Sequence, residues 1–254
     1  MNLPFVVLIP ARLQSSRLPN KPLADLGGKA MVVRVAERAR LSGAQQVVVA
    51  TDSQAIVQVC EQNGVQVVLT REDHDNGTDR LAEAAHLLNL PPETVVVNVQ
   101  GDEPMIDPAL IQSVAAYLHQ HAVPVATAVH QVHEAADFLN PNVVKVVLNA
   151  HSQALYFSRA PIPYPRDEMP SLQEKASVSC QSVLRHIGIY GYRASFLSQY
   201  SHLTPCALEN IEKLEQLRIL WHGHAIGVVV SENIPEAGVD TPEDLIRMQK
   251  RFEA

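Results

Sequence analysis

Short runs of valine and isoleucine recur along the chain, and segments with the spacing of an amphipathic helix separate them. Residues 5–9, 46–50, 65–69 and 94–99 are four such runs, with few polar side chains among them. A strand that is apolar at nearly every position is buried on both faces. Such strands, when they alternate with helices, are typical of a parallel sheet covered on both sides. We therefore predict an α/β fold with a mostly parallel central sheet and helices on both faces.

The same patterns set the other expected elements. Leucine and isoleucine at helical spacing predict one continuous helix over residues 208–221. Thr241 and Asp244 form a capping-box pattern, with Asp in place of Glu or Gln, at the start of a last helix. Further helices are expected over residues 31–41, 53–63 and 78–88 and from Asp107 onward. Further strands are expected over residues 124–132, 184–192 and 225–230, with a hairpin over 143–148 and 154–158.

The length of 254 residues suits a single domain over residues 1–254, with about 135–205 as an added region. No apolar run is long enough to cross a bilayer, and the first residues lack the basic region and cleavage site of a signal peptide. We therefore expect a soluble, cytoplasmic protein. Cys60, Cys180 and Cys206 lie far apart without a CxxC pair, which favours free thiols over disulfides or a zinc site.

The formal net charge is −7 and no long basic run is present, which argues against a nucleic-acid partner. Positive charge is instead local. Between Pro10 and Pro22, directly after the first strand, the only charged residues are Arg12, Arg17 and Lys21. Such a loop suits phosphate oxygens, although a solvated basic loop would look the same. The loop has no GxxxxGK[ST] or GxGxxG pattern, which weakens the ATPase and dehydrogenase interpretations.

Two aspartates are candidates for holding a metal ion. Asp102 follows Gly101 just past the buried run 94–99, where a carboxylate can hold magnesium on a nucleotide. An ordinary Gly-Asp turn would give the same sequence. Asp240 stands just before the last helix, where a capping residue is equally expected. The residues alone leave both alternatives open.

With these segments in view, the chain closely resembles the 3-deoxy-manno-octulosonate (Kdo) cytidylyltransferases, or CMP-Kdo synthetases, within the nucleotide-diphospho-sugar transferase fold. The resemblance runs almost from end to end, and its last three blocks are the most specific to Kdo enzymes. It rests on IPAR (9–12), SSRLP (15–19), KP (21–22), VATD (49–52), NGTDRLAE (76–83), NVQGDEP (98–104), NPNVVKV (140–146), LYFSR (155–159), RHIGIYGY (185–192), LEQLR (214–218) and GVDTPEDL (238–245).

The resemblance implies an enzyme that joins CTP to Kdo and releases pyrophosphate, with Mg²⁺ as cofactor, as a homodimer that serves lipopolysaccharide assembly. It assigns catalysis to Arg12, Lys21 and Asp102, and Mg²⁺ to Asp102 and Asp240. It assigns the nucleotide to Ala11, Arg12, Ser15, Arg17, Lys21, Arg71, Asn76, Gly77 and Gln100. It assigns the sugar to Arg159, His186, Tyr190, Glu215 and Gln216. The dimer contact is expected within about residues 135–205.

Departures from the family pattern remove no charge and no ligand. Asn20 stands where the family usually has glycine, and asparagine is the next most tolerant residue for a left-handed backbone. The histidine pairs do not suggest a further metal site, because two histidines rarely suffice without a third ligand. We expect these six to be structural or surface residues: His119, His121, His130, His133, His222 and His224.

Three other functions remain open at this level. A cytidylyltransferase for 8-amino-Kdo or sialic acid is the nearest, and Arg159 with the 185–192 strand favours Kdo. A glycosyltransferase of the same fold would normally carry a DxD motif, where this chain has Gly-Asp-Glu at 101–103. A non-catalytic nucleotide-sugar binder would need a broken site, whereas every expected charge is present.

Overall fold

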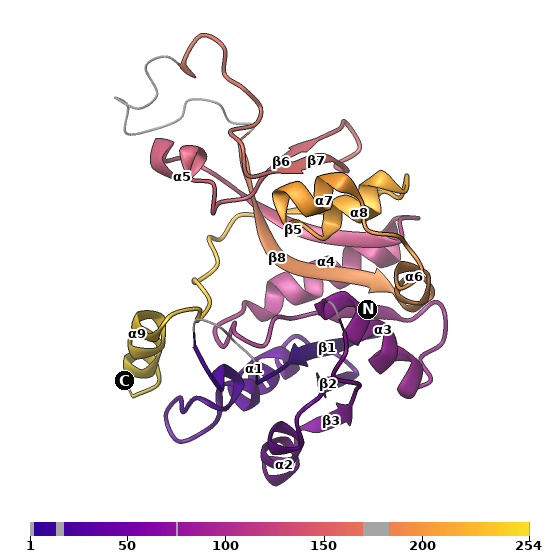
Figure 1. Ribbon diagram of the computed structural model, residues 1–254, viewed down its shortest axis with the longest axis vertical. Coiled ribbons are helices and arrows are strands. Elements are labelled where there is room, and N and C mark those ends of the chain that lie inside the picture. Colours follow the sequence, from indigo (N-terminus) through magenta and orange to yellow (C-terminus); the bar gives the residue numbers. More distant parts are fainter. Residues whose placement is uncertain (1–2, 14–17, 75, 170–182, 254) are drawn as a thin grey trace.

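The computed structural model describes residues 3–13, 18–74, 76–169 and 183–253. Within these residues nine strands form one sheet, whose main path runs β3-β2-β1-β4-β8-β5-β9 (Figure 1). The strands are β1 (Phe5–Ala11), β2 (Gln46–Thr51), β3 (Gln66–Leu69), β4 (Val95–Asn98), β5 (Val125–Gln131), β6 (Lys145–Leu148), β7 (Ala154–Ser158), β8 (Leu184–Arg193) and β9 (Ile226–Ser231).

The main path of the sheet is mostly parallel, as the sequence predicts. β1 pairs in parallel with β2 and β4, β2 with β3, and β5 with β9. β8 is the exception on the main path, because it runs antiparallel to both β4 and β5. Its first residues also pair with β6, which forms the expected hairpin with β7. Because β1, β2, β3 and β4 run in parallel, the ends of β1, β3 and β4, and the polar loops that follow them, share one edge of the sheet.

Helices cover both faces of this sheet (Figure 1). They are α1 (Met31–Arg40), α2 (Gln54–Gln62), α3 (Gly77–Leu87), α4 (Pro108–Gln120), α5 (Ala135–Leu139), α6 (Ala194–Tyr200), α7 (Ala207–Glu212), α8 (Gln216–Trp221) and α9 (Pro242–Glu253), with a 3₁₀ turn η1 (Lys21–Leu23). None of the helices in the described ranges is long and apolar enough to pass through a membrane.

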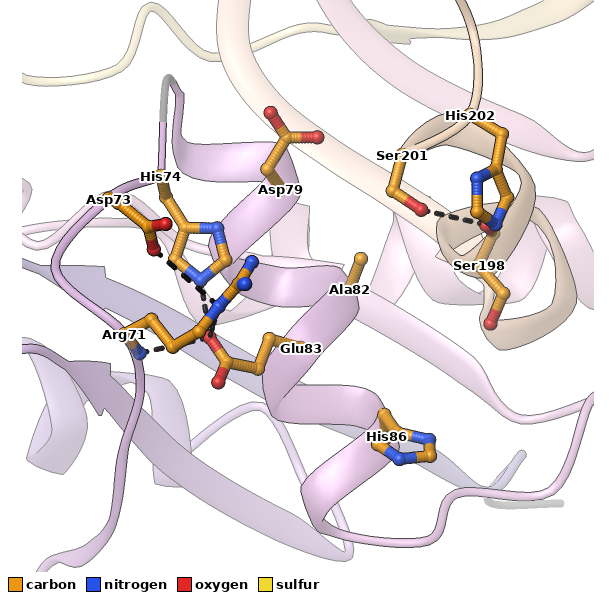
Figure 2. Close-up of a pocket in the computed structure, with 10 residues that line it drawn as sticks. All are labelled: Arg71, Asp73, His74, Asp79, Ala82, Glu83, His86, Ser198, Ser201 and His202. Atoms are coloured by element: carbon orange, nitrogen blue, oxygen red, sulfur yellow. Dashed lines mark hydrogen bonds and ion pairs between the residues drawn. The ribbon is translucent and has the colours of Figure 1, made fainter.

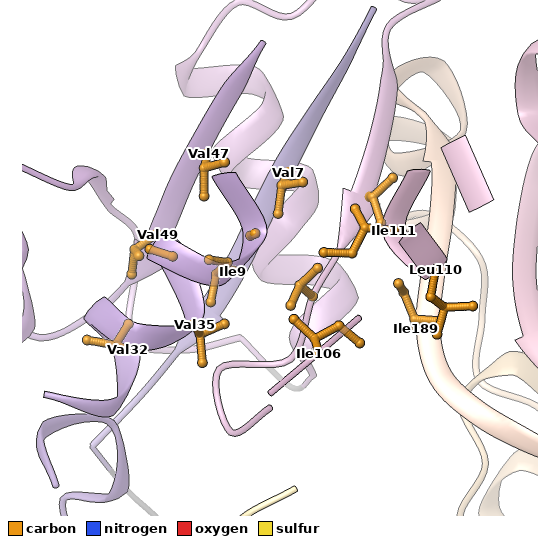
Figure 3. Packing of buried hydrophobic residues seen from close by; sticks show 14 of the residues in the cluster. Val7, Ile9, Val32, Val35, Val47, Val49, Ile106, Leu110, Ile111 and Ile189 are labelled. Atoms are coloured by element: carbon orange, nitrogen blue, oxygen red, sulfur yellow. The ribbon is translucent and has the colours of Figure 1, made fainter. Parts of the chain in front are cut away.

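Alternation along β1 divides the interior into two clusters. Phe5, Val7 and Ile9 pack with α1, α2 and α4 on one face. Figure 3 shows Val7 and Ile9 within this cluster. Val6 and Leu8 point the other way and pack with α3, α6 and α8. Because successive side chains in a strand point to opposite faces, this register buries every residue of the run. Helices on both faces thus follow from the uniformly apolar strand.

The continuous helix predicted over residues 208–221 is wrong. Two six-residue helices, α7 and α8, occupy this stretch. Between them Lys213 adopts a left-handed backbone with φ 53°, which ends α7. The pattern of apolar residues continues through the break, since Leu214 and Leu217 are buried on either side of the start of α8. The spacing of apolar residues alone therefore did not reveal the break. The break also turns the side chains of Glu212 and Glu215 in different directions.

Local predictions at chain turns are confirmed. Asn20 has φ 56°, the left-handed conformation expected of the residue that replaces glycine. At the start of α9 the Thr241 hydroxyl accepts from the Asp244 N–H at 3.2 Å, and the Asp244 carboxylate accepts from the Thr241 N–H at 3.1 Å. These two bonds form the capping box. Cys60 and Cys206 are free and buried, whereas Cys180 lies outside the described residues.

Candidate active site

One cation and two carboxylates meet beyond the ends of β1 and β4. The Lys21 ammonium donates to Asp102 Oδ2 at 2.5 Å and to Asp240 Oδ1 at 3.2 Å. In the sequence, Asp102 lies 81 positions and Asp240 lies 219 positions after Lys21. The Lys21 side chain is 14% exposed, while Asp102 and Asp240 are 29% and 50% exposed. The structure thus unites the three residues that the sequence placed in separate loops.

Two glycines allow these loops to approach. A Cβ on Gly101 would lie 2.9 Å from the Pro10 carbonyl oxygen, so the loop after β4 can pass the end of β1 only with glycine there. A Cβ on Gly238 would lie 3.1 Å from the Asp102 carbonyl oxygen. That carbonyl accepts from the Val239 N–H at 2.9 Å. Asp102 and Asp240 are therefore held together through backbone contacts rather than through their side chains alone.

The donor set at this edge fits a small, hard divalent cation. Asp102 and Asp240 both direct a carboxylate oxygen at one positive charge, the Lys21 ammonium, and Mg²⁺ takes few protein carboxylates. Glu103 lies beside them, but burial, reinforced by the charges of Asp102 and Asp240, raises its pKa to about 8. A carboxyl with that pKa is mostly protonated at neutral pH. The geometry around the Lys21 ammonium offers two carboxylates, those of Asp102 and Asp240, as ligands for such a cation.

The start of the first loop, just after β1, lies beside a groove. Arg12 lines this groove together with Leu13, Asp52, Ser53, Gln54 and Glu72. Ala11 is buried at the end of β1, where it pairs with Thr51 of β2. The predicted roles of Ser15 and Arg17 lie outside the described residues. The loop thus delivers Arg12 and Lys21 to the same edge of the sheet.

The predicted nucleotide residues beyond this loop are spread along the edge. Arg71 lines a second groove between α3 and α6 and pairs there with Asp73 at 3.5 Å (Figure 2). Asn76 is the N-cap of α3 and accepts from the Asp79 N–H at 2.9 Å, with Gly77 as the first helical residue. Gln100 reaches β8, where it donates to the Gly188 carbonyl at 3.4 Å. Arg71 and Arg12 line different grooves, so the structure does not bring all of these residues together.

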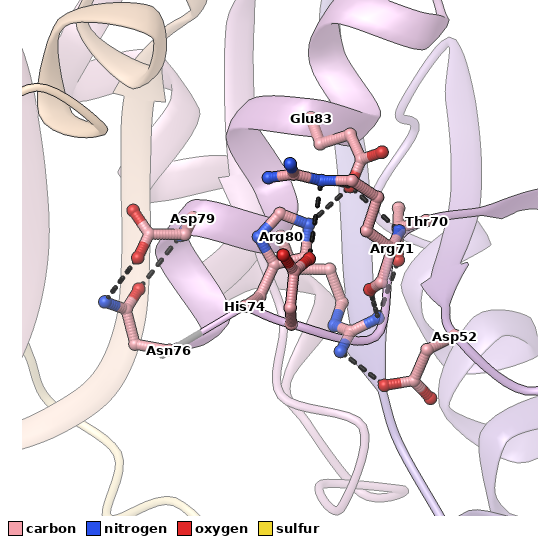
Figure 4. A network of polar contacts seen from close by, with 9 residues as sticks. Asp52, Thr70, Arg71, His74, Asn76, Asp79, Arg80 and Glu83 are labelled. Carbon is pink, nitrogen blue, oxygen red and sulfur yellow. Dashed lines mark hydrogen bonds and ion pairs between the residues drawn. The ribbon is translucent and has the colours of Figure 1, made fainter.

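A buried arginine that sequence reasoning missed organises this part of the edge (Figure 4). Arg80 of α3 is 3% exposed and donates to Asp52 Oδ2 and to Thr70 Oγ1, each at 2.6 Å. Asp52 follows β2 and Thr70 follows β3, so one guanidinium ties two strand ends to α3. It also donates to the Arg71 carbonyl at 3.4 Å. The only signal in the sequence was a charged residue within the apolar face of a helix.

The predicted sugar residues His186 and Tyr190 both lie on β8. Their ring centroids are 5.2 Å apart, and Phe157 of β7 meets the His186 ring edge-on at 5.2 Å. His186 Nε2 lies 2.9 Å from the Thr127 hydroxyl, which itself donates to the Ile189 carbonyl at 2.7 Å. His186 Nε2–H is therefore the donor to Thr127. Burial lowers the pKa of His186 to about 3, so the ring is neutral at physiological pH.

Polar groups without protein partners gather near Tyr190. Within the described residues, the Tyr190 and Tyr200 hydroxyls and Asn98 Oδ1 are buried and have no hydrogen-bond partner. Glu215, at the start of α8, accepts from the Thr78 hydroxyl at 3.2 Å, and burial raises its pKa. Glu215 also raises the pKa of Tyr190, after the larger effect of burial. Gln216 follows it and is 4% exposed. Buried donors and acceptors that lack partners are what a polyhydroxylated ligand would satisfy.

Arg159 lies at the end of β7, next to the same region. Its Nε donates to the Glu212 carbonyl at 2.7 Å and its Nη1 to the Pro141 carbonyl at 3.0 Å. Lys145 pairs with Ser158 of β7 on one side and with Arg185 of β8 on the other. Arg159 and His186 therefore each follow a residue that flanks Lys145, with β6 lying between β7 and β8. The structure brings the five predicted sugar residues to β7, β8 and the α7–α8 break.

A family model described as cytidylyltransferase matches residues 6–228. The chain is similar to the solved structure of CMP:2-keto-3-deoxy-manno-octonic acid synthetase complexed with CTP, with 42% sequence identity and a TM-score of 0.87 over 98% of each chain. It also shares its fold with a cytidylyltransferase from Leptospira borgpetersenii serovar Hardjo-bovis (strain JB197), at 16% identity and a TM-score of 0.61, covering 98% of this chain and 86% of that one.

Proposed function

This chain belongs to the cytidylyltransferase family, among the CMP-Kdo synthetases, and on that premise we propose how it acts. It is a nucleotidyltransferase that transfers CMP from CTP to Kdo and releases pyrophosphate. The single observation that carries this function is the match over 98% of both chains to a CMP-Kdo synthetase in complex with CTP. The meeting of Lys21, Asp102 and Asp240 at the edge of the sheet supports it independently.

The reaction forms one bond and breaks another. The anomeric 2-hydroxyl of Kdo loses its proton and attacks the α-phosphorus of CTP, and the bond from that phosphorus to the bridging oxygen of pyrophosphate breaks. Such a transfer asks the protein mainly to position the reactants and to stabilise charge. Arg12 and Lys21, which follow β1, would hold phosphate oxygens and offset the charge of the leaving pyrophosphate.

We propose that Asp102 and Asp240 hold Mg²⁺, because their carboxylate oxygens converge on one positive charge, the Lys21 ammonium. A magnesium ion bound there would supply charge stabilisation at the α-phosphate and lower the pKa of a bound hydroxyl. For the chain itself, the consequence is that no side chain need act as the base.

The sugar would lie against β7, β8 and the start of α8. Arg159 provides the positive charge for the carboxylate of Kdo. His186 is neutral and can contribute hydrogen bonds but no charge, since burial keeps its pKa low. The Tyr190 hydroxyl, Glu215 and Gln216 offer partners for sugar hydroxyls, and the unpartnered hydroxyl of Tyr190 supports that assignment.

Pyrophosphate release tests this function directly. We expect release when the protein is incubated with CTP, Mg²⁺ and Kdo, and loss of release when EDTA is added. Matched reactions contain UTP or ATP in place of CTP, or sialic acid or 8-amino-Kdo in place of Kdo. Release with a different acidic sugar and none with Kdo would overturn the assignment of the sugar. Pyrophosphate release that persists in EDTA would overturn the assignment of Mg²⁺ as the cofactor.

We further propose that the enzyme is a homodimer through the region of residues 135–205. β7 pairs along its length with β6 alone among the described strands, and edge strands with apolar side chains tend to pair or be covered. Leu155 on β7 and Tyr164 beyond it are 60% and 65% exposed. Light scattering should therefore give about twice the chain mass of 27.9 kDa. A monomer mass at micromolar concentration would contradict the dimer.

The same premise suggests where the enzyme acts. We propose a cytoplasmic location, where CTP is available, and a product that serves lipopolysaccharide assembly.

A further inference from the structure

Glu212, the last residue of α7, holds the end of β7 through three hydrogen bonds. Its carboxylate accepts from the Ser158 hydroxyl at 2.7 Å, from the Arg159 N–H at 2.8 Å and from the Tyr156 hydroxyl at 3.4 Å. Its backbone carbonyl accepts from Arg159 Nε at 2.7 Å. One residue therefore fixes both the backbone and the side chain of Arg159. A carboxylate that accepts three such bonds is strongly held in place.

Lys145 fixes the opposite side of the same arginine. Its side chain is buried, and its three ammonium donors match three carbonyl oxygens, those of Asn140, Val143 and Arg159. Burial, helped by the nearby charge of Arg159, lowers its pKa to about 8, so it remains mostly charged at neutral pH. The turn that it holds contains Pro141, whose carbonyl accepts from Arg159 Nη1 at 3.0 Å. Lys145 thus holds in place the turn that carries the Pro141 carbonyl, the second hydrogen-bond acceptor of the Arg159 guanidinium.

These contacts leave the arginine oriented and still charged. Within the described residues, both bonds of its guanidinium go to neutral carbonyls and neither goes to a carboxylate. Nη2 and one hydrogen of Nη1 remain to meet an incoming anion in the forked geometry that carboxylates accept. The neighbouring His186 is neutral and offers no competing charge.

We propose that Glu212 is a positioning residue that sets Arg159 for the carboxylate of the acidic sugar, with Lys145 completing the clamp. This inference rests on the proposed function, because it gives Arg159 the sugar carboxylate as its ligand. Glu212 itself touches Arg159, Ser158 and Tyr156, and it acts on the sugar only through the arginine. The left-handed Lys213 directly after it ends α7 and lets its carbonyl point at Arg159.

The test compares steady-state constants for both substrates. Glu212→Ala is expected to raise the KM for Kdo about 10- to 100-fold, as expected when a charged hydrogen bond loses its geometry, and to change the KM for CTP less than about twofold. Glu212→Gln keeps an oxygen acceptor and should give a smaller rise in the same constant. It also keeps the inference testable if the alanine variant folds poorly. The matched control is Glu209→Gln on the same helix, whose carboxylate holds Arg218 at 2.6 and 2.8 Å.

A double-mutant cycle with Arg159→Ala separates positioning from general stability. If Glu212 acts through Arg159, the double variant loses no more affinity for Kdo than Arg159→Ala alone. Additive losses, parallel rises in both KM values, or the same rise in the Glu209→Gln control would overturn the inference.

The wild-type protein is measured first, so that the two conclusions can fail separately. Turnover of Kdo tests the proposed function, and only the ratios between variants test the positioning role. If another acidic sugar is turned over, the identity of the sugar is overturned and the same ratios with that sugar decide the role of Glu212. No turnover with any acidic sugar overturns both.

Discussion

Asp102→Asn is expected to lower kcat about 1,000-fold or more while leaving the fold intact. The asparagine keeps the shape of the side chain and removes the charge that would hold Mg²⁺ opposite Asp240. Charge stabilisation by a catalytic metal amounts to several kcal/mol, and each 1.36 kcal/mol is a factor of ten in rate. The measurement is pyrophosphate release at saturating CTP and Kdo, with circular dichroism and thermal unfolding to follow the fold.

Asp107→Asn is the matched control for that variant. Asp107 lies on the same loop after β4, but its carboxylate caps α4 by accepting from the Ala109 N–H at 2.9 Å. Its replacement should cost a little stability and leave kcat near the wild-type value. A near-normal rate for Asp102→Asn would show that Asp102 does not hold the metal.

Arg80→Leu is expected to lower the free energy of unfolding by about 3–5 kcal/mol, the usual cost of leaving one member of a buried ion pair without its partner. The Asp52 carboxylate, 17% exposed, would lose its bond at 2.6 Å, and Thr70 would lose its donor. For a chain of this size the loss corresponds to a fall in Tm of about 10 °C. Urea unfolding followed by tryptophan fluorescence or circular dichroism measures the change.

The exposed pair of Arg185 with Asp137 provides the comparison. These side chains are 40% and 42% exposed and lie 3.7 Å apart, so Arg185→Leu should cost less than about 1 kcal/mol. The double variant Asp52→Leu with Arg80→Leu should recover part of the loss, because no buried charge then remains unpaired. Equal losses for Arg80→Leu and Arg185→Leu would contradict a special role for the buried network.

The fold was predictable where one physical rule dominated. The valine runs at β1, β2 and β4 could be nothing but strands buried on both faces, which required helices on both sides of the sheet. The direction of β8 was not predictable. The sequence of Leu184–Arg193 would look the same whether the neighbouring strands run parallel or antiparallel to it. The break at Lys213 was missed for a similar reason, since apolar spacing continues through it.

The sequence could name candidate charged residues for the site, but not the residues that hold them in place. Lys21, Asp102 and Asp240 could be named from the sequence and its resemblance, and the structure brings them together. Lys145 stands alone among valines in the sequence, and nothing there indicates that it would hold Arg159 and the turn at 140–143. Glu212 falls within an apparently regular helix. Their roles depend on partners 14 and 53 residues away, which no local pattern encodes.

The assignment of particular nucleotide contacts to Arg71, Asn76, Gly77 and Gln100, and of a single domain over residues 1–254, stays a prediction. Asn76 already has its amide engaged with Asp79, which accepts from Nδ2 at 2.8 Å.

The break between α7 and α8 also makes the site modular. Helices of six residues have almost no stability of their own, since isolated helices need about 12–15 residues, so α7 and α8 owe their order to the sheet beneath them. The residues proposed for the sugar come from these helices, β7 and β8, whereas Lys21, Asp102 and Asp240 come from other loops. The specificity for the acceptor can therefore diverge in one part of the chain while the part that serves the donor nucleotide is kept.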